Sequence, residues 1–334
     1  MNKLNLRQYQ QCTRCVMDTD ATDIVFDQYG VCNYCSEFLE RSRHILGQNS
    51  VSKKEKLHQI IAKVKADGKG KPYDCIVGVS GGVDSSWTIV EVKRLGLRPL
   101  AVHMDNGWNS ELAQNNISNL LSTLNVDLYT HVIDWDEYRE LMQAFFDADV
   151  IDVELLYDNA MLSVNYQQAN KYNLKYILAG TNNATEGMRI PKEWNWFKYD
   201  KRNIKDLAKR NGIKVFKTFP VIGTSGFIWH HFIKGIRWTS FLDYLPYNKF
   251  EALDDLEKHY GFKRYLSKHH ESVFTRFYQS YILPKKFNVD KRKIHLATLV
   301  TAGQMSRKEA LKALKGTAYF SDMDMEADVK YFLK

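Results

Sequence analysis

The sequence of 334 residues lacks any uncharged apolar run of about 18 residues, the length that a membrane-spanning helix needs. The best candidate, residues 227–245, is interrupted by polar and charged side chains at His230, His231, Lys234, Arg237 and Asp243. Residues 1–5, Met-Asn-Lys-Leu-Asn, contain no apolar core of a secretory signal. These absences predict a cytoplasmic protein with no membrane partner.

The sequence also lacks internal repeats and low-complexity tracts. Apolar residues make up 44% and charged residues 26%, which are ordinary values for a globular protein. At this length we expect one large domain with appendages, or two domains. The net charge of +8 suits an anionic partner such as a nucleotide, an acidic sugar, a nucleic acid or an anionic lipid, although a mild excess is more often just a solvated surface.

Cysteine is scarce, and four of the five cysteines form two close pairs. Two residues separate Cys12 from Cys15 and Cys32 from Cys35, and sixteen residues lie between the pairs. In a cytosolic protein this spacing is typical of a structural zinc site, in which four thiolates complete a tetrahedron. Disulfides or an iron–sulfur cluster are the alternatives. The fifth, Cys75, lies in a predicted core strand and is interpreted as a small apolar residue.

From residue 73 onward, predicted strands and helices alternate. Strands are expected at residues 73–79, 98–104, 127–133, 175–179 and about 214–219, with helical patterns between most of them. This order is typical of α/β proteins and predicts a doubly wound parallel sheet of five strands. The expected divisions are a four-cysteine knuckle at 1–48, a linker helix at 49–71, the sheet domain at 72–222 and a mainly helical domain at 223–334.

The first predicted strand runs directly into a glycine-rich turn, residues 80–85, with the sequence Ser-Gly-Gly-Val-Asp-Ser. Glycines let backbone N–H groups approach an oxygen closely, the start of the following helix carries partial positive charge, and the serine hydroxyls add donors. The alternative is a turn that only reverses the chain. The spacing is neither that of a Walker A loop nor that of the dinucleotide loop G-x-G-x-x-G. It resembles the pyrophosphate loop of the PP-loop ATP pyrophosphatases, which split ATP into AMP and pyrophosphate.

Three polar, glycine-containing loops follow predicted strands, at residues 80–86, 103–108 and 179–187. In open α/β sheets, ligands bind beyond the carboxyl ends of the strands, so we expect these loops to hold ATP. Asp84 and Glu186 are expected to hold Mg²⁺, which prefers carboxylate and phosphate oxygens. The predicted nucleotide-binding residues are Ser80, Gly81, Gly82, Asp84, Ser85, Ser86, His103, Asp105, Asn106, Gly180, Thr181, Asn182 and Glu186.

Two of these loops make the resemblance to PP-loop enzymes more specific. The Asp-Asn-Gly at 105–107 and the Gly-Thr-Asn-Asn at 180–183 are similar to loops of amide-forming PP-loop enzymes, such as asparagine and NAD synthetases. The whole chain resembles the N-acetyl sugar amidotransferase family, which pairs a four-cysteine knuckle with a PP-loop domain and carries a tail similar to residues 268–279 and 283–293 here. The resemblance covers nearly all 334 residues, although Leu266 and Ser267 stand where the family has two glycines.

The resemblance implies an enzyme that converts the N-acetyl group of a bacterial surface-polysaccharide sugar to an acetamidino group. It implies that the amide oxygen attacks the α-phosphate of ATP, that an imidate–AMP forms, and that ammonia then displaces AMP. The C-terminal helical domain would close the active site with the dense titratable cluster of its tail, for which a solvated helix face is the alternative. The catalytic residues implied in this way are Asp84, Lys268, His269, His270, Glu271 and Arg276.

The chain offers no glutaminase of its own, because residue 2 is Asn2 rather than a nucleophilic cysteine and Cys75 lies in a predicted strand. Ammonia is therefore expected from a partner. The family implies a glutaminase and a channel-forming barrel that resemble the two subunits of imidazole-glycerol-phosphate synthase. The sugar substrate is expected to be anionic or nucleotide-linked.

Two other classes fit part of the sequence. A tRNA-modifying PP-loop enzyme would share the knuckle, the basic charge and the AMP-forming chemistry. Sulfur transfer, however, normally needs a reactive cysteine, and four of the five cysteines belong to the knuckle. A nucleic-acid module without catalytic activity would leave the three polar loops unexplained, and its knuckle is poor in interleaved basic and aromatic residues. Nucleic acid is therefore not the expected partner.

Overall fold

The computed structural model of the chain describes residues 8–46, 50–265, 271–316, 319 and 321–333. The chain divides into two compact units. The first, here called the sheet unit, contains residues 49–181 and 196–276. The second, the knuckle unit, is assembled from residues 1–48, 182–195 and 277–334. Each unit therefore joins segments that are distant in the sequence.

The sheet unit is built around one five-stranded parallel sheet with the strand order β3-β2-β1-β4-β5. This order reverses between β1 and β4, which is the pattern of a doubly wound α/β fold with its ligand crevice at the reversal. The predicted fold class is thus confirmed. The strands are β1 (Cys75–Gly78), β2 (Pro99–Asp105), β3 (Leu128–Val132), β4 (Tyr176–Ala179) and β5 (Arg237–Ser240).

The prediction of the fifth strand at residues 214–219 is wrong, because β5 lies at Arg237–Ser240 and pairs with β4. In residues 217–219 the backbone N–H groups point at a side chain instead of a neighbouring strand. The carboxylate of Glu137 accepts from the N–H of Lys217 (2.6 Å), Thr218 (2.8 Å) and Phe219 (3.2 Å). Because these N–H groups already have an acceptor, residues 217–219 do not need to pair with a neighbouring strand.

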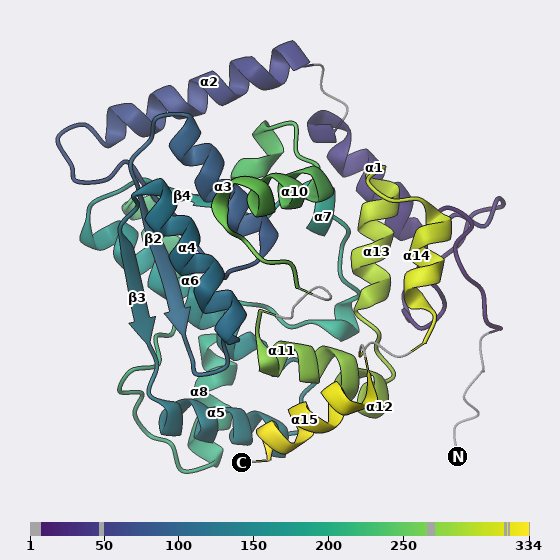
Figure 1. Ribbon diagram of the computed structural model, residues 1–334. Coiled ribbons are helices and arrows are strands. Elements are labelled where there is room, and N and C mark those ends of the chain that lie inside the picture. The colour runs from purple at the N-terminus through teal and green to yellow at the C-terminus, as the bar shows by residue number, and fades with distance from the viewer. Residues whose placement is uncertain (1–7, 47–49, 266–270, 317–318, 320, 334) are drawn as a thin grey trace. The chain divides into compact units, whose positions relative to one another are not determined.

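Helices cover both faces of the sheet (Figure 1). Val77 of β1 faces a core that includes residues of α2, α3, α4 and α10, whereas the adjacent Ile76 faces a core that includes α6. Among the described residues, no helix is both long and apolar enough to cross a membrane. The helices are α2 (Ser50–Asp67), α3 (Val83–Arg94), α4 (Glu111–Leu124), α5 (Trp135–Asp147), α6 (Leu155–Lys171), α8 (Lys201–Arg210), α9 (Thr224–Ile228), η2 (Trp229–Ile233), η3 (Phe241–Tyr244), α10 (Lys249–Tyr260) and α11 (Val273–Phe277).

In the knuckle unit, α13 packs against α1, α7 and α14. A capping box is present at the start of α14, where the Ser306 hydroxyl accepts from the Glu309 N–H and the Glu309 carboxylate accepts from the Ser306 N–H. The elements of this unit are α1 (Asn33–Leu46), α7 (Asn183–Glu186), η1 (Lys192–Trp194), η4 (Tyr278–Ile282), α12 (Leu283–Phe287), α13 (Arg292–Thr301), α14 (Arg307–Leu314) and α15 (Asp322–Phe332).

Candidate active site and metal centre

Hydrogen bonds within the loop after β1 fix its conformation. The Ser85 hydroxyl accepts from the Ser80 N–H (3.2 Å) and donates to the Gly82 carbonyl (3.1 Å), while the Ser80 hydroxyl accepts from the Gly82 N–H (3.3 Å). Gly81 has a φ of +84°, and a Cβ there would lie 3.1 Å from Ala113, so no other residue fits easily. Gly82 caps α3 without a side chain, which leaves the helix start accessible to an anion.

The loop after β4 lies against this turn at the point where the strand order reverses. A Cβ on Gly180 would lie 2.8 Å from the carbonyl carbon of Asp84 and from the backbone nitrogen of Ser85. Only glycine therefore lets the two loops approach this closely. The Thr181 hydroxyl is 3.1 Å from the hydroxyl of Ser240, at the end of β5. Residues 80–85 and 180–181 thus lie together at the carboxyl ends of β1 and β4, the part of a doubly wound sheet where ligands bind.

The loop after β2 is organised by a buried histidine. His103 Nδ1 is 2.8 Å from the Val79 carbonyl, so it carries the proton and donates, and Nε2 accepts from the Asn109 amide (3.3 Å). Burial lowers the pKa of His103, despite the Val79 carbonyl and Asp105, so the ring is neutral at pH 7. The Asp105 carboxylate accepts from the Gly107 N–H (2.9 Å), and the Asn106 side chain accepts from the Trp108 N–H (3.2 Å). These predicted nucleotide-binding side chains also build their own loop.

The tail segment is attached to this same loop. The Ser110 N–H donates to the Glu271 carbonyl and the Val273 N–H donates to the Trp108 carbonyl, both at 2.9 Å, around an antiparallel bridge between residues 109 and 272. The ring of Phe274 lies 5.6 Å from that of Trp108. This attachment brings the Glu271 carboxylate to within 3.5 Å of the position that a Cβ on Gly82 would occupy.

The other members of the predicted tail cluster are placed as follows. Lys268, His269 and His270 lie outside the described residues. Arg276 lies in α11, where its N–H donates to the Ser272 carbonyl (3.0 Å). Glu271 is therefore the member of this cluster whose side chain is seen beside the glycine-rich turn.

Two tyrosines that sequence reasoning missed also contact this turn. The Tyr247 hydroxyl donates a hydrogen bond to the Asp84 carboxylate, and the Tyr265 hydroxyl donates to the Gly81 carbonyl (2.8 Å). Burial raises the pKa of Tyr265, which keeps its hydroxyl protonated as a donor. No motif marks either residue, because the C-terminal region has many aromatic residues and these two have no distinctive spacing. The sequence feature that could have pointed to these tyrosines is the run of polar and aromatic residues that follows β5.

Two predicted nucleotide-binding residues belong to the knuckle unit. Asn182 is buried and caps α7, where its side-chain oxygen accepts from the Thr185 N–H (2.9 Å). Glu186 ends that short helix with an exposed side chain. The other members of the predicted nucleotide set belong to the sheet unit, in which Ser86 is buried in the first turn of α3.

The four knuckle cysteines converge in the knuckle unit. Their sulfur atoms all lie within 4.8 Å of one another, with Cys12 and Cys35 at 4.0 Å and Cys15 and Cys32 at 3.7 Å. These distances exclude S–S bonds and match the edges, about 3.8 Å, of a tetrahedron with metal–sulfur bonds of about 2.3 Å. All four are fully buried, as a closed structural site requires.

Backbone and side-chain donors surround these sulfur atoms. Cys12 Sγ accepts from the N–H groups of Cys15 (3.4 Å) and Cys32 (3.3 Å), and Cys15 Sγ accepts from that of Met17 (3.4 Å). The Thr301 hydroxyl lies 3.5 Å from Cys35 Sγ. Such donors stabilise thiolate charge and orient metal ligands.

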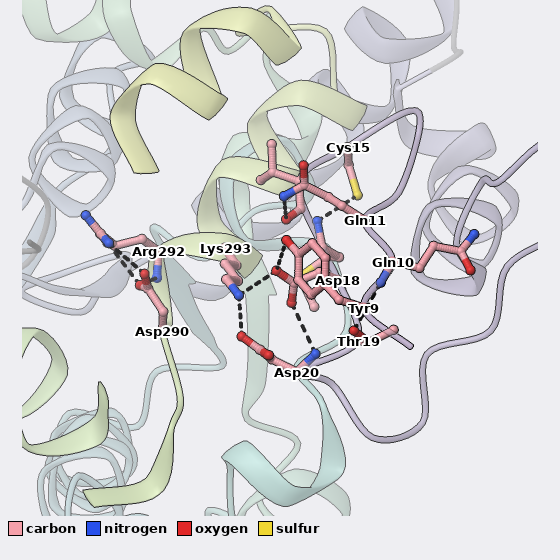
Figure 2. Close-up of polar contacts among 12 residues, drawn as sticks. Tyr9, Gln10, Gln11, Cys15, Asp18, Thr19, Asp20, Asp290, Arg292 and Lys293 are labelled. Atoms are coloured by element: carbon pink, nitrogen blue, oxygen red, sulfur yellow. Dashed lines mark hydrogen bonds and ion pairs between the residues drawn. The ribbon is translucent and has the colours of Figure 1, made fainter. Parts of the chain in front are cut away.

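Helices from the far end of the chain hold the cysteine loop in place (Figure 2). Lys293 of α13 donates to Asp18 (2.5 Å) and forms an ion pair with Asp20, and the Tyr9 hydroxyl also donates to Asp18 (3.2 Å). Arg307 of α14 donates to the carbonyls of Cys12 and Cys15, at 2.8 and 2.9 Å. The four-cysteine cluster is therefore held by contacts between the first and last parts of the sequence.

Comparison with known proteins identifies two segments. Residues 53–221 match the family described as NAD synthase, and residues 271–334 match the C-terminal domain of WbpG-like lipopolysaccharide (LPS) biosynthesis proteins. A comparison with curated proteins gave no significant match.

Solved structures with local similarity include two synthetases of nucleotide metabolism. The NMN synthetase from Francisella tularensis is 17% identical, with a TM-score of 0.30 and coverage of 65% of this chain and 98% of that one. The NH3-dependent NAD synthetase from Campylobacter jejuni is 16% identical, with a TM-score of 0.32 and coverage of 76% and 97%. Because these TM-scores are low, the fold assignment rests on the sheet topology and on the family match.

The NAD synthase match covers about half of the 334 residues, from α2 to the end of the loop that follows α8. The glycine-rich turn and the loops after β2 and β4 all lie within it. The WbpG-like match begins at Glu271, the residue whose backbone binds the loop after β2. The chain therefore belongs to the NAD synthase family and joins its ATP-using PP-loop domain to a WbpG-like C-terminal domain, which supports a PP-loop amidotransferase of surface polysaccharide biosynthesis.

Proposed function

We propose that this protein is a cytoplasmic, ATP-dependent amidotransferase that converts the N-acetyl group of a bacterial surface-polysaccharide sugar to an acetamidino group. The observation that carries the proposal is the attachment of the WbpG-like segment to the loop after β2. Its first residue, Glu271, binds the loop after β2 through its backbone and faces Gly82 with its carboxylate. A segment matched to lipopolysaccharide biosynthesis thus lies beside the glycine-rich turn, which supports a sugar substrate that reacts next to ATP.

The reaction has two steps. The amide oxygen of the sugar attacks the α-phosphorus of ATP, the bond to pyrophosphate breaks, and an imidate–AMP forms with loss of the amide proton. Ammonia then adds to the imidate carbon, and AMP leaves with the former amide oxygen. Adenylation is needed because an amide oxygen is a very poor leaving group, and AMP carries it away.

The residues of the crevice have separate tasks in this scheme. The backbone N–H groups of residues 80–85 and the hydroxyls of Ser80 and Ser85 bind the leaving pyrophosphate and stabilise its developing charge. Asp84 is the assigned Mg²⁺ ligand, since its carboxylate stands at the helix start beside the anion loop. When bound, Mg²⁺ neutralises phosphate charge. Tyr247 and Tyr265 orient Asp84 and the turn.

We assign the tail cluster to the sugar and to proton transfer. Lys268 and Arg276 would neutralise phosphate or a sugar carboxylate, and His269 or His270 would accept the proton that ammonia loses on attack. Glu271 would orient that histidine or the acetamido nitrogen. Ammonia is proposed to come from a glutaminase through a channel-forming barrel subunit.

In the knuckle unit, the geometry of the four thiolates supports a structural Zn²⁺ ion bound by Cys12, Cys15, Cys32 and Cys35. A closed set of four sulfur ligands leaves no open position for a reacting group. We therefore assign this ion to the folding of the knuckle rather than to the reaction.

The test incubates the purified protein with ATP, Mg²⁺, ammonium chloride and a panel of nucleotide-linked and anionic N-acetyl sugars. We expect AMP and pyrophosphate in equal amounts, and a product about one mass unit lighter than the sugar, because NH replaces O. The Asp84→Asn variant is the matched control. Formation of AMP only with a deamidated dinucleotide or with tRNA would refute the proposal.

A further inference from the structure

One segment carries the whole net charge of this protein. Residues 201–242 contain nine Lys and Arg and a single acidic residue, Asp206, which gives +8, the same as the entire chain. The other 292 residues are therefore balanced. Basic residues that are concentrated in one segment indicate an anionic partner more strongly than a mild excess of charge spread over the surface.

The same segment exposes large apolar side chains. α9 continues directly into the π-helix η2, and together they present Ile228, Trp229, Phe232 and Ile233 to solvent. Phe232 is 70% exposed and Ile233 is 72% exposed. Scattered single exposures are common, but four large apolar residues within six positions of one helix form a patch.

Ring contacts extend this patch to a third exposed aromatic residue, Phe197. The rings of Phe197 and Tyr199 are 5.8 Å apart, and those of Tyr199 and Phe227 are 4.7 Å apart. Phe227 in turn stacks on His231 of η2 at 5.4 Å. Phe197 is itself exposed, so the apolar surface continues from η2 to the segment before α8.

Two lysines border this apolar surface, and α8 carries further exposed cations. A Cβ on Gly223, the residue before α9, would lie 3.0 Å from Lys201, the first residue of α8. α8 displays Arg202, Lys205 and Lys209 as exposed side chains. Directly after η2, the Lys234 ammonium lies over the Trp229 ring at 4.9 Å.

We propose that α9 and η2 dock this protein on an anionic membrane surface, with Phe232, Ile233, Ile228 and Trp229 entering the headgroup region and the cations of α8 facing lipid phosphates. Exposed aromatic and aliphatic side chains bordered by Lys and Arg are the composition of interfacial helices. Bases of a nucleic acid would stack on the rings but would leave the isoleucines without a partner. The expectation of no membrane partner came from the lack of a spanning run, which does not concern a surface contact. The proposal does not depend on the proposed reaction.

The test is sedimentation of the full-length protein with vesicles of phosphatidylcholine alone or with roughly a third of phosphatidylglycerol. We expect binding to the anionic vesicles, weakened by salt. Arg202→Gln/Lys205→Gln/Lys209→Gln should weaken it at least tenfold, since each cation near an anionic surface contributes about fivefold. Phe232→Ser/Ile233→Ser should also lose it.

Matched controls are available elsewhere on the chain. Lys54→Gln/Lys56→Gln/Lys63→Gln removes three exposed cations of α2, and Met323→Ser removes an exposed apolar side chain of α15. Both should bind like the unaltered protein. Brominated lipid should quench tryptophan fluorescence, and Trp229→Phe should lose most of that quenching.

Three results would overturn the proposal. The first is no binding to anionic vesicles, or equal losses in the patch and control variants. The second is a dimer in sedimentation velocity that Phe232→Ser/Ile233→Ser converts to a monomer, which would make the patch a contact between copies. The third is a tRNA gel shift that the α8 variant abolishes while vesicle binding is absent.

Discussion

Replacing Lys293 by methionine tests whether the C-terminal helices hold the metal knuckle together. The Lys293 ammonium donates to Asp18, whose side chain is only 2% exposed, and forms an ion pair with Asp20. Burial alone would lower the pKa of Lys293, but the two aspartates raise it overall. Lys293 is therefore charged in the folded state at pH 7, which lies far below its unfolded pKa of about 10.4. Its stabilising contribution is fully present at that pH.

The Lys293→Met variant keeps the length of the side chain but leaves the Asp18 carboxylate buried without its cation. Removal of one partner from a buried ion pair typically costs about 3–5 kcal/mol. Here the lysine is 15% exposed and Asp18 keeps the Tyr9 hydrogen bond, so we expect the lower end, about 3 kcal/mol. The loss should fall on the knuckle unit, which contains every residue of this cluster.

The assay is equilibrium urea unfolding at pH 7, followed by circular dichroism, together with the rate at which a chelator removes zinc. Lys308→Met, at an exposed position of α14, is the matched control and should change the free energy of unfolding by less than about 0.5 kcal/mol. Asp18→Asn/Lys293→Met should recover part of the loss, because the uncompensated charge is removed. Equal stability and equal zinc release in Lys293→Met and Lys308→Met would refute the reasoning.

Four further predictions concern the two sites. Asp84→Asn should keep the fold and lose most AMP release, as measured by chromatography of the nucleotides; unchanged release would remove Asp84 from the metal assignment. The purified protein should carry about one zinc per chain by elemental analysis, and Cys32→Ser should lose both zinc and knuckle stability. Because the pKa of His103 is lowered by burial, its contribution to stability is present above about pH 6.5 and is lost as the pH falls further, so unfolding free energies measured from pH 7 to 5 should decline less in His103→Gln. Lys268→Ala and Arg276→Ala should each lower kcat/KM at least about tenfold with little change in Tm, and normal kinetics in both would make the cluster a solvated helix face.

Several features of this protein follow from local sequence. The strand, glycine-rich turn and helix around residues 75–94 are contiguous, so periodicity and the glycine positions suffice to predict them. The cysteine pairs and the Ser306 capping box are equally local. Four of the five strands can be predicted, because β1, β2 and β4 contain apolar runs and β3 is rich in β-branched and aromatic residues.

The tertiary structure alone decided where distant segments meet. Residues 214–219 have a strand-like pattern, yet the Glu137 carboxylate binds their N–H groups, and β5 forms instead at Arg237–Ser240. Asp18 and Lys293 are 275 positions apart, and no pattern in either segment indicates the pairing. A hydrogen bond or an ion pair between remote side chains depends on the packing of whole elements, which propensity and periodicity do not encode.

The same division applies to the candidate active site. The glycine-rich turn was visible in the sequence because an anion loop needs particular residues at particular spacings. The contacts of Tyr247 with Asp84 and of Tyr265 with Gly81 were not, because a single tyrosine carries no spacing signal. The sequence by itself determined which chemical groups are available, whereas the tertiary structure decided which of them share a site, since that depends on the strand order and on the return of the chain to the carboxyl ends of the sheet.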